Sequence, residues 1–268
     1  CDDDNPTTVS DTYTAACTCQ GGAVDVAARI FLDGPFTGAD MNDGLRAAGL
    51  VPLTEPYTAL NFHPAEPGGG EGTIAPVLSI TGPDAIVDWV MLALRDDGPP
   101  YARINIRMAL LQRDGDIVDV DGTGPVRFSQ VPGSYMLEIR HRNHLGIMTA
   151  LPMPEVPTGT LLSMDFTTPA TGCFGTNARK TIGPVMALWA GNTVNNGRLS
   201  YTGVSNDRDP ILIKVGSTTP NNVVNGYFRE DTNLDGSVRY AGAGNDRDRI
   251  LVNVGSSTPN NVNLEQLP

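Results

Sequence analysis

The fold is decided by residues 85–112, which read AIVDWVMLALRDDGPPYARINIRMALLQ. Two runs of apolar and β-branched residues, Ala85–Arg95 and Ala102–Gln112, flank the turn-forming sequence Asp97-Gly98-Pro99-Pro100. Apolar runs bounded by Gly and Pro are typical of buried β-strands. The stretch therefore predicts two strands separated by a turn.

Similar patterns extend this prediction in both directions along the chain. The further strands that we expect are Val24–Leu32, Thr73–Thr81, Ile117–Asp121, Ser134–His141 and Thr160–Thr167, and the spacing in Met41–Gly49 predicts a short helix. This alternation of strands with turns suits two packed antiparallel sheets. We predict a mostly β protein with an antiparallel β-sandwich over residues 23–170, followed over residues 171–268 by a small duplicated calcium-loop module with short helices.

Composition narrows the class of protein. The chain has 268 residues, with 30 acidic and 18 basic side chains, and its formal net charge is −12. An acidic surface repels phosphate, so we expect no nucleic-acid partner. No apolar run approaches the ~20 residues of a membrane-spanning helix, and 40% hydrophobic residues are too many for a disordered chain.

Residues 1–22 are polar and are expected to form an N-terminal arm. The chain begins with Cys1 and three aspartates, which resembles the start of bacterial lipoproteins whose first cysteine is acylated. The alternatives are a free thiol or a disulfide with one of the other three cysteines, and every alternative places the protein outside the cytoplasm. We expect a disulfide or a neighbouring copy to hold the arm, which could add a strand to the neighbour's sheet.

The last third of the chain contains an internal repeat. Residues 192–224 align without gaps with residues 231–263, and 18 of the 33 aligned positions are identical. Two copies are too few for a solenoid. The repeat therefore predicts a pseudo-twofold pair of units around a common core.

The second copy carries a calcium-loop pattern. Its candidate ligands are Asp231, Asn233, Asp235, Ser237, Asp246 and Asp248. Oxygen side chains at loop positions 1, 3 and 5, a Gly at position 6 and a backbone carbonyl at position 7 form the first half of an EF-hand loop. Because Gly242 occupies position 12, where a bidentate acid belongs, we expect the late aspartates to close a lengthened loop at a helix start.

The first copy has lost most of this pattern. Asn192 and Asn196 stand where the second copy has Asp231 and Asp235, while Asp207 and Asp209 remain. Two interpretations stay open for this copy, which are weak binding of calcium and a loop that only folds alike.

The paired loops over residues 192–263 resemble a dockerin-like tandem of calcium loops, although the late acidic ligands depart from that family. A broader resemblance, to the C-terminal region of large secreted surface proteins of Bacteroidetes-type bacteria, is carried by Arg29–Pro35, Leu53–Tyr57, Val87–Val90, Arg113–Asp116 and Arg140–Gly146. The resemblance implies adhesion or surface structure and assigns no catalytic residue.

Other candidate sites are weaker. The acids between Asp114 and Asp121 suggest a solvated turn more than a second calcium site. His141 and His144 are three residues apart and are expected on opposite faces of a strand, which disfavours a zinc site. No hydrolase triad suggests itself.

These observations lead us to expect a non-enzymatic extracellular or cell-surface protein with calcium (Ca²⁺) as its one cofactor. The main hypothesis is a structural or adhesive protein that self-associates with copies of itself into a filament. The alternatives are a surface lipoprotein that binds a glycan or a protein partner, with membrane attachment only through a lipid on Cys1, and a secreted hydrolase that uses a pair of carboxylates.

Overall fold

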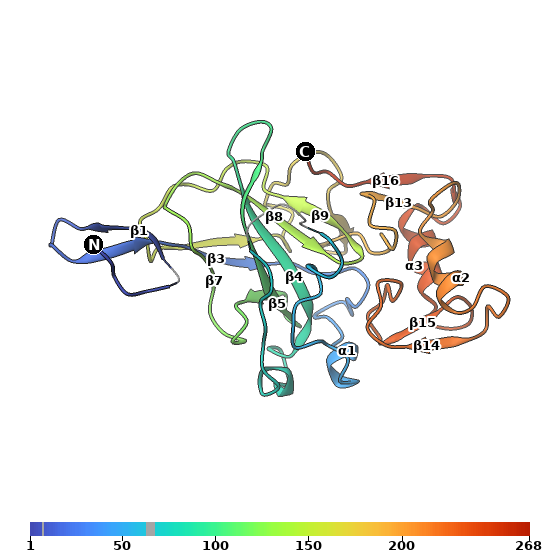
Figure 1. The fold of residues 1–268 in the computed structure, drawn as a ribbon. Coiled ribbons are helices and arrows are strands. Elements are labelled where there is room, and N and C mark those ends of the chain that lie inside the picture. Colours follow the sequence, from blue (N-terminus) through green and yellow to red (C-terminus); the bar gives the residue numbers. More distant parts are fainter. Residues whose placement is uncertain (7, 63–67) are drawn as a thin grey trace.

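The computed structural model describes residues 1–6, 8–62 and 68–268, and the protein is mostly β, with 33% strand and 8% helix (Figure 1). His63 lies outside the described residues. The largest sheet follows the order β10 (Leu161–Asp165), β3 (Val24–Arg29), β6 (Asp116–Val118), β5 (Arg103–Gln112), β4 (Ile86–Arg95), β8 (Met136–His141) and β9 (His144–Met148), with β7 (Val126–Phe128) also on β3. All pairs are antiparallel except β10 with β3. The strands thus join in one connected sheet, and the two-sheet sandwich is not confirmed.

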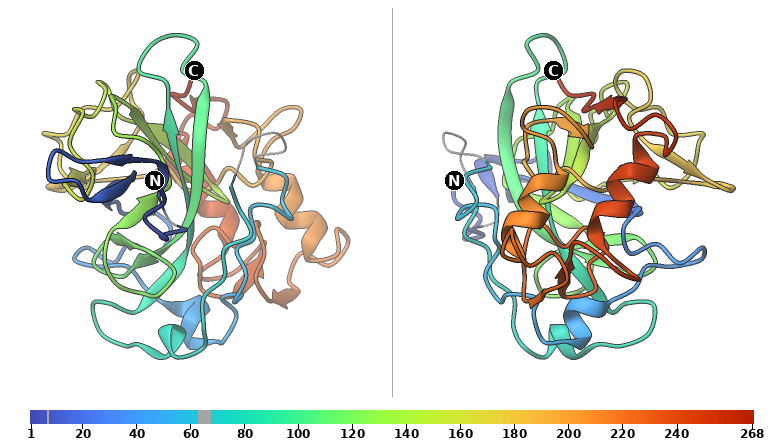
Figure 2. Two further views of the ribbon diagram at one scale, coloured as in Figure 1. Left: turned by 60° about the vertical axis from the view of Figure 1, so that its left-hand side comes forward. Right: turned by 90° about the vertical axis from the view of Figure 1, so that its right-hand side faces the viewer.

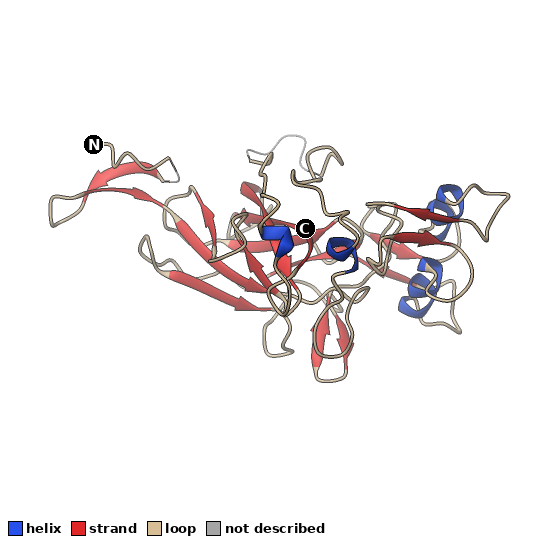
Figure 3. Cartoon of the chain, turned by 90° about the horizontal axis from the view of Figure 1, so that it is seen from below, coloured by secondary structure: helices blue, strands red, loops and turns tan. Residues whose placement is uncertain are grey.

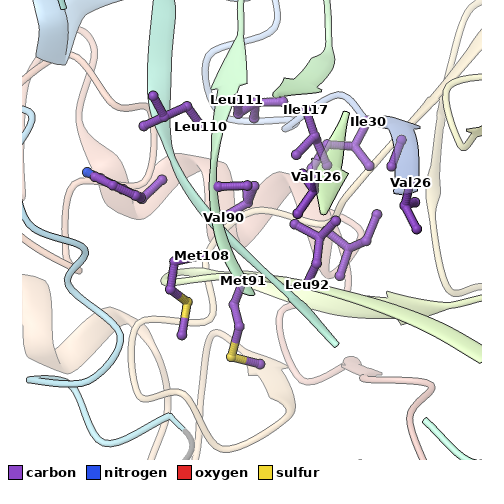
Figure 4. Packing of buried hydrophobic residues seen from close by; sticks show 14 of the residues in the cluster. Val26, Ile30, Val90, Met91, Leu92, Met108, Leu110, Leu111, Ile117 and Val126 are labelled. Atoms are coloured by element: carbon purple, nitrogen blue, oxygen red, sulfur yellow. The ribbon is translucent and has the colours of Figure 1, made fainter. Parts of the chain in front are cut away.

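The central strands form the predicted core. All ten residues of β4 are buried, because loops and the short helix α1 (Gly44–Ala47) cover it, and a strand covered on both faces is apolar without alternation. Figure 4 shows Val90, Met91 and Leu92 of this strand among side chains from β5, β6, β7 and β3. Trp89 is fully buried, and its Nε1 donates to the carbonyl oxygen of Pro52 at 2.8 Å.

Several local predictions need correction. The strand expected at Thr73–Thr81 is wrong, because Pro76 caps a single 3₁₀ turn, η1 (Val77–Ser79), there. Strands β7 and β9 were not predicted, since three to five residues carry too little periodicity. The expected helix in Met41–Gly49 is present as the shorter α1.

The N-terminal arm is a β-hairpin. Strands β1 (Val9–Tyr13) and β2 (Cys19–Gly22) pair with each other in a two-stranded sheet, and β2 leads directly into β3. A disulfide joins Cys1 to Cys19, while Cys17 and Cys173 are free thiols. The hairpin projects from one end of the main sheet (Figures 1 and 3). A sulfur in this disulfide is not available for the lipid that the alternative prediction attached to Cys1.

The repeat folds as two intertwined copies at the opposite end of the molecule (Figures 1 and 2). Its elements are β13 (Arg198–Ser200), α2 (Arg208–Lys214) and β14 (Val223–Asn225) from the first copy, and β15 (Ser237–Arg239), α3 (Asp246–Asn253) and β16 (Val262–Leu264) from the second. Each strand pairs across the copies, β13 with β16 and β14 with β15. Equivalent residues form the shared core, namely Leu199 with Val238, Ile211 with Ile250 and Val215 with Val254. Among the helices of the described residues, none is long and apolar enough to cross a bilayer.

The repeat packs tightly on the main sheet. A hairpin of β11 (Lys180–Ile182) and β12 (Val185–Ala187) precedes it, and Leu188 pairs with Leu32 in an isolated bridge. Leu234 of the second loop belongs to the main hydrophobic core. A Cβ on Gly34 would overlap with the carbonyl oxygen of Thr232, so this glycine allows the loop to approach.

Candidate metal centre

The second loop, residues 231–237, is built by its own polar side chains. The carboxylate of Asp231 accepts from the amides of Asp235 at 3.2 Å and Gly236 at 2.9 Å. The side-chain oxygen of Asn233 accepts from Asp235 N at 2.9 Å, and the carboxylate of Asp235 accepts from Ser237 N at 2.8 Å. Each of these hydrogen bonds joins a side chain to a backbone amide two to five residues later and so closes a tight turn. The side chains of Asp231, Asn233 and Asp235 therefore all accept hydrogen bonds from backbone amides of the same loop.

Asp246, at the start of α3, holds the two ends of this loop through hydrogen bonds. Its carboxylate accepts from Thr232 N at 2.7 Å and from Arg239 N at 2.8 Å, one amide on each side of the loop. Burial, together with the negative charge of Asp231, raises the pKa of Asp246 to about 7. Burial also raises the pKa of Asp231 to about 6. Burial is the main cause of both shifts, and a cation beside these carboxylates would favour their charged forms.

The other late acid does not join the loop. Asp248 lies in the first turn of α3, where its amide and carboxylate pair with the side chain of Asn245 at 3.0 and 2.8 Å. Its side chain is 56% exposed and also meets Arg247. This is a helix cap. Arg239, which follows the loop, forms an ion pair with Oδ2 of Asp235 at 2.6 Å.

The first copy repeats the fold of the loop without its charge. Asn192 accepts from Asn196 N at 3.3 Å, Asn196 accepts from Arg198 N at 3.0 Å, and Asp207 accepts from Val194 N and Ser200 N. Burial raises the pKa of Asp207 to about 7. The side chain of Asn206 accepts from Asp209 N at the start of α2, as the side chain of Asn245 accepts from Asp248 N at the start of α3. The first copy therefore favours a loop that folds alike over one that holds a cation.

The donor set of the second loop fits a hard cation in part. Two carboxylates, the amide oxygen of Asn233 and the carbonyl of Ser237 are the oxygen ligands that calcium prefers. Among the described residues, only Asp2, Asp3 and Asp11 bring three acidic ligand atoms within 4.8 Å of one another, and that cluster is largely exposed. The second loop has no third acid at that range, because Asp246 is engaged by backbone amides.

The turn between β8 and β9 holds a buried polar network that sequence reasoning missed. His141 and His144 were expected on opposite faces, which is wrong, because they lie directly across the hairpin from each other. Their Nδ1 atoms are 2.9 Å apart, and both residues are 1% exposed. Gly34 N donates to Nε2 of His144 at 3.3 Å, so Nδ1 carries the proton of a neutral ring. Burial lowers the pKa of both imidazoles, which favours their uncharged forms.

This network centres on Asp88 of β4. Arg142 Nε, Tyr227 OH and His141 Nε2 all contact its carboxylate, at 2.9, 2.6 and 3.0 Å. Although burial alone would raise it, the charge of Arg142 and the contact with His141 bring the pKa of Asp88 down to about 2. The side chain of Asn143 donates to the carbonyl of Asp231 at 2.6 Å. The network therefore fixes the first residue of the second loop to the main sheet. The signal in the sequence was the polar run 140–144 between two apolar strands.

No family model matches this chain, and comparisons with curated proteins and with solved structures find no match either.

Proposed function

We propose that this chain is a non-enzymatic, calcium-stabilised structural or adhesive protein of the bacterial cell surface that self-associates into a filament. In this proposal a sandwich-like β body carries a dockerin-like calcium module at one end and a strand-adding arm at the other. The observation that carries the self-association is the disulfide-tied hairpin of β1 and β2.

Calcium would be held by Asp231, Asn233, Asp235 and the Ser237 carbonyl. Bound there, it would neutralise the buried negative charge shared by Asp231 and Asp246 and hold the loop closed. Sites with few acids bind weakly, on the order of 10⁻⁴–10⁻³ M, which suits an extracellular module. The same loop is fixed to the β8–β9 turn by Asn143, so the cation would stabilise the junction with the main sheet as well.

Self-association would use the edge of the hairpin. Within the described residues, β1 pairs only with β2, and Tyr13 on β1 is 70% exposed. At the far end of the main sheet order, β10 is an edge strand and carries the half-exposed Leu161. An unpaired strand edge is a template for a strand from another chain. A contact between two different surfaces of the chain is heterologous and propagates.

An extracellular location agrees with the disulfide between Cys1 and Cys19, since disulfides persist in oxidising compartments. The bond encloses the hairpin and would keep the arm in one shape for pairing.

The test is the assembly state of the purified chain in calcium. We expect electron microscopy and sedimentation velocity to show oligomers or filaments of the wild-type chain. Tyr13→Lys, which places a charge on the hairpin edge, should reduce them, whereas Leu151→Lys, at another exposed apolar side chain, should not. Monomers at every concentration would refute the proposal.

A further inference from the structure

Three side chains from distant parts of the chain meet beneath the repeat. Lys180 begins β11, Asn253 ends α3, and Asp33 follows β3. Lys180 Nζ lies 2.8 Å from Asp33 Oδ1 and 2.7 Å from Asn253 Oδ1. Asn253 Nδ2 donates to Asp33 Oδ2 at 2.7 Å. An amine, a carboxamide and a carboxylate are therefore in mutual contact.

The site is shielded from water. Asp33 is 2% and Asn253 is 4% exposed, and the Lys180 side chain is 17% exposed. The ring of Trp189 lies 5.8 Å from Lys180 Nζ. Arg249 contacts the same oxygen of Asp33 as the lysine, at 3.3 Å. Asn253 Nδ2 also donates to the carbonyl of Ala190 at 2.8 Å, which fixes the orientation of the amide.

We propose that Lys180 and Asn253 condense into an intramolecular isopeptide bond, with Asp33 as the catalytic residue that transfers protons. Asp33 takes a proton from the lysine ammonium, and the free amine attacks Cγ of Asn253. A bond forms between Nζ and Cγ, and Asp33 then takes the second proton that Nζ must lose. Asp33 passes both protons in turn to Nδ2 as the bond between Cγ and Nδ2 breaks, so the leaving nitrogen departs as ammonium. One ammonia leaves for each amide formed, so the step needs no oxidant, metal or further reactant.

The positions of Lys180, Asn253 and Asp33 favour this reaction. The amine touches the carbonyl oxygen, and the carbon under attack is one bond further, about 1.2 Å along the C=O axis. Holding the reactants at this range replaces a bimolecular encounter with a step within one molecule, which lowers the barrier. The carboxylate already touches both nitrogens that exchange protons, as a general acid–base must.

The inference is specific to one copy of the repeat and independent of calcium. Lys214 stands in the first copy where Asn253 stands in the second, and it faces Glu230 instead of a carboxamide. The bond would link α3, at the end of the repeat, covalently to the β11 hairpin that packs on the main sheet. Pulling on the repeat would then load a covalent bond instead of a packed interface.

The test is the intact mass of the full chain after reduction and denaturation. We expect it to fall short of the sequence mass by one ammonia. Trypsin should leave Lys180 uncut and release residues 180–198 joined to residues 250–268. The full sequence mass in the folded wild-type protein would overturn the proposal.

Two variants separate this bond from other losses of ammonia. Asn196-Gly197 and Asn225-Gly226 could lose ammonia by forming a succinimide, which does not involve Lys180. Lys180→Arg keeps the charge but cannot form the amide, so it should have the full mass. A loss of ammonia in both proteins, with no joined peptide from the wild type, would overturn the proposal. Asp33→Asn, checked for folding by circular dichroism, should keep the full mass, and a bond formed at the wild-type rate would refute the role of Asp33.

Discussion

Calcium should stabilise the protein at pH 8 and hardly at pH 5. With a dissociation constant on the order of 10⁻⁴–10⁻³ M, about 10 mM calcium would add roughly 1.4–2.7 kcal/mol to the free energy of unfolding. For a chain of this size, that corresponds to a rise in melting temperature of about 3–5 °C.

The pH dependence follows from the buried acids of the second loop. The pKa of Asp231 is raised to about 6 and that of Asp246 to about 7 in the metal-free fold. For an acid whose folded pKa is raised, the stabilisation is complete below the unfolded pKa and is lost as the pH rises through the folded value. For Asp246, this loss is on the order of 3–4 kcal/mol by pH 8. Acid should therefore raise the free energy of unfolding of the metal-free protein by protonating these carboxylates. At pH 8, calcium should raise it by neutralising their charge.

The assay is thermal unfolding with calcium and with chelator at pH 5 and pH 8. Asp235→Asn should abolish the response to calcium at pH 8. Asp248→Asn should keep it, because the carboxylate of Asp248 pairs with the side chain of Asn245 at the start of α3. An equal response at both pH values, or a response lost in Asp248→Asn alone, would refute the reasoning.

Three further predictions concern the packing of the body. Gly34→Ala should lower the free energy of unfolding by about 1–3 kcal/mol through the clash with the second loop, whereas Gly98→Ala, which meets nothing within 4 Å, should be nearly neutral in urea titrations. The pKa of His144 is lowered in the folded protein. Its contribution to the free energy of unfolding is therefore complete above the unfolded pKa and is lost as the pH falls through the folded pKa, so His144→Gln should flatten the dependence of stability on pH below about pH 6.5. An unchanged pH dependence in the variant would contradict this. Glu138→Ala should destabilise by about 3–5 kcal/mol, since it leaves the buried Arg95 without its carboxylate; a loss below 1 kcal/mol would show that the ion pair matters little.

Much of the local structure could be predicted because it depends on near neighbours. The strands at Ala85–Arg95 and Ala102–Gln112 were expected from apolar runs and turns, and both are present as β4 and β5. The helix start at the late aspartates of the second copy was expected as well, and α3 begins at Asp246. By contrast, Thr73–Thr81 is apolar enough for a strand, but it folds as a 3₁₀ turn. No strand of the described residues pairs with it, and pairing depends on the whole sheet.

The candidate calcium loop also has a part that could be predicted from the sequence and a part that could not. Spacing alone identified Asp231, Asn233 and Asp235, since the turns among them join residues two to five apart. Spacing could not show that Asp248 belongs to a helix cap, because the choice depends on how α3 meets the loop.

By itself, the sequence determined the strand-rich class, the duplication and the loop pattern, because periodicity, turn chemistry and repeat spacing are properties of short segments. Only the tertiary structure decided which remote groups meet. Asp33 and Asn253 are 220 residues apart in the chain, and Asp33 and Lys180 are 147 apart, yet packing brings all three into contact in a nearly dry site. The facing imidazoles of His141 and His144 are also a tertiary outcome, since strand pairing and the approach of Gly34 together set their positions. Hydrogen bonds between remote side chains depend on the packing of whole layers, which no local pattern encodes.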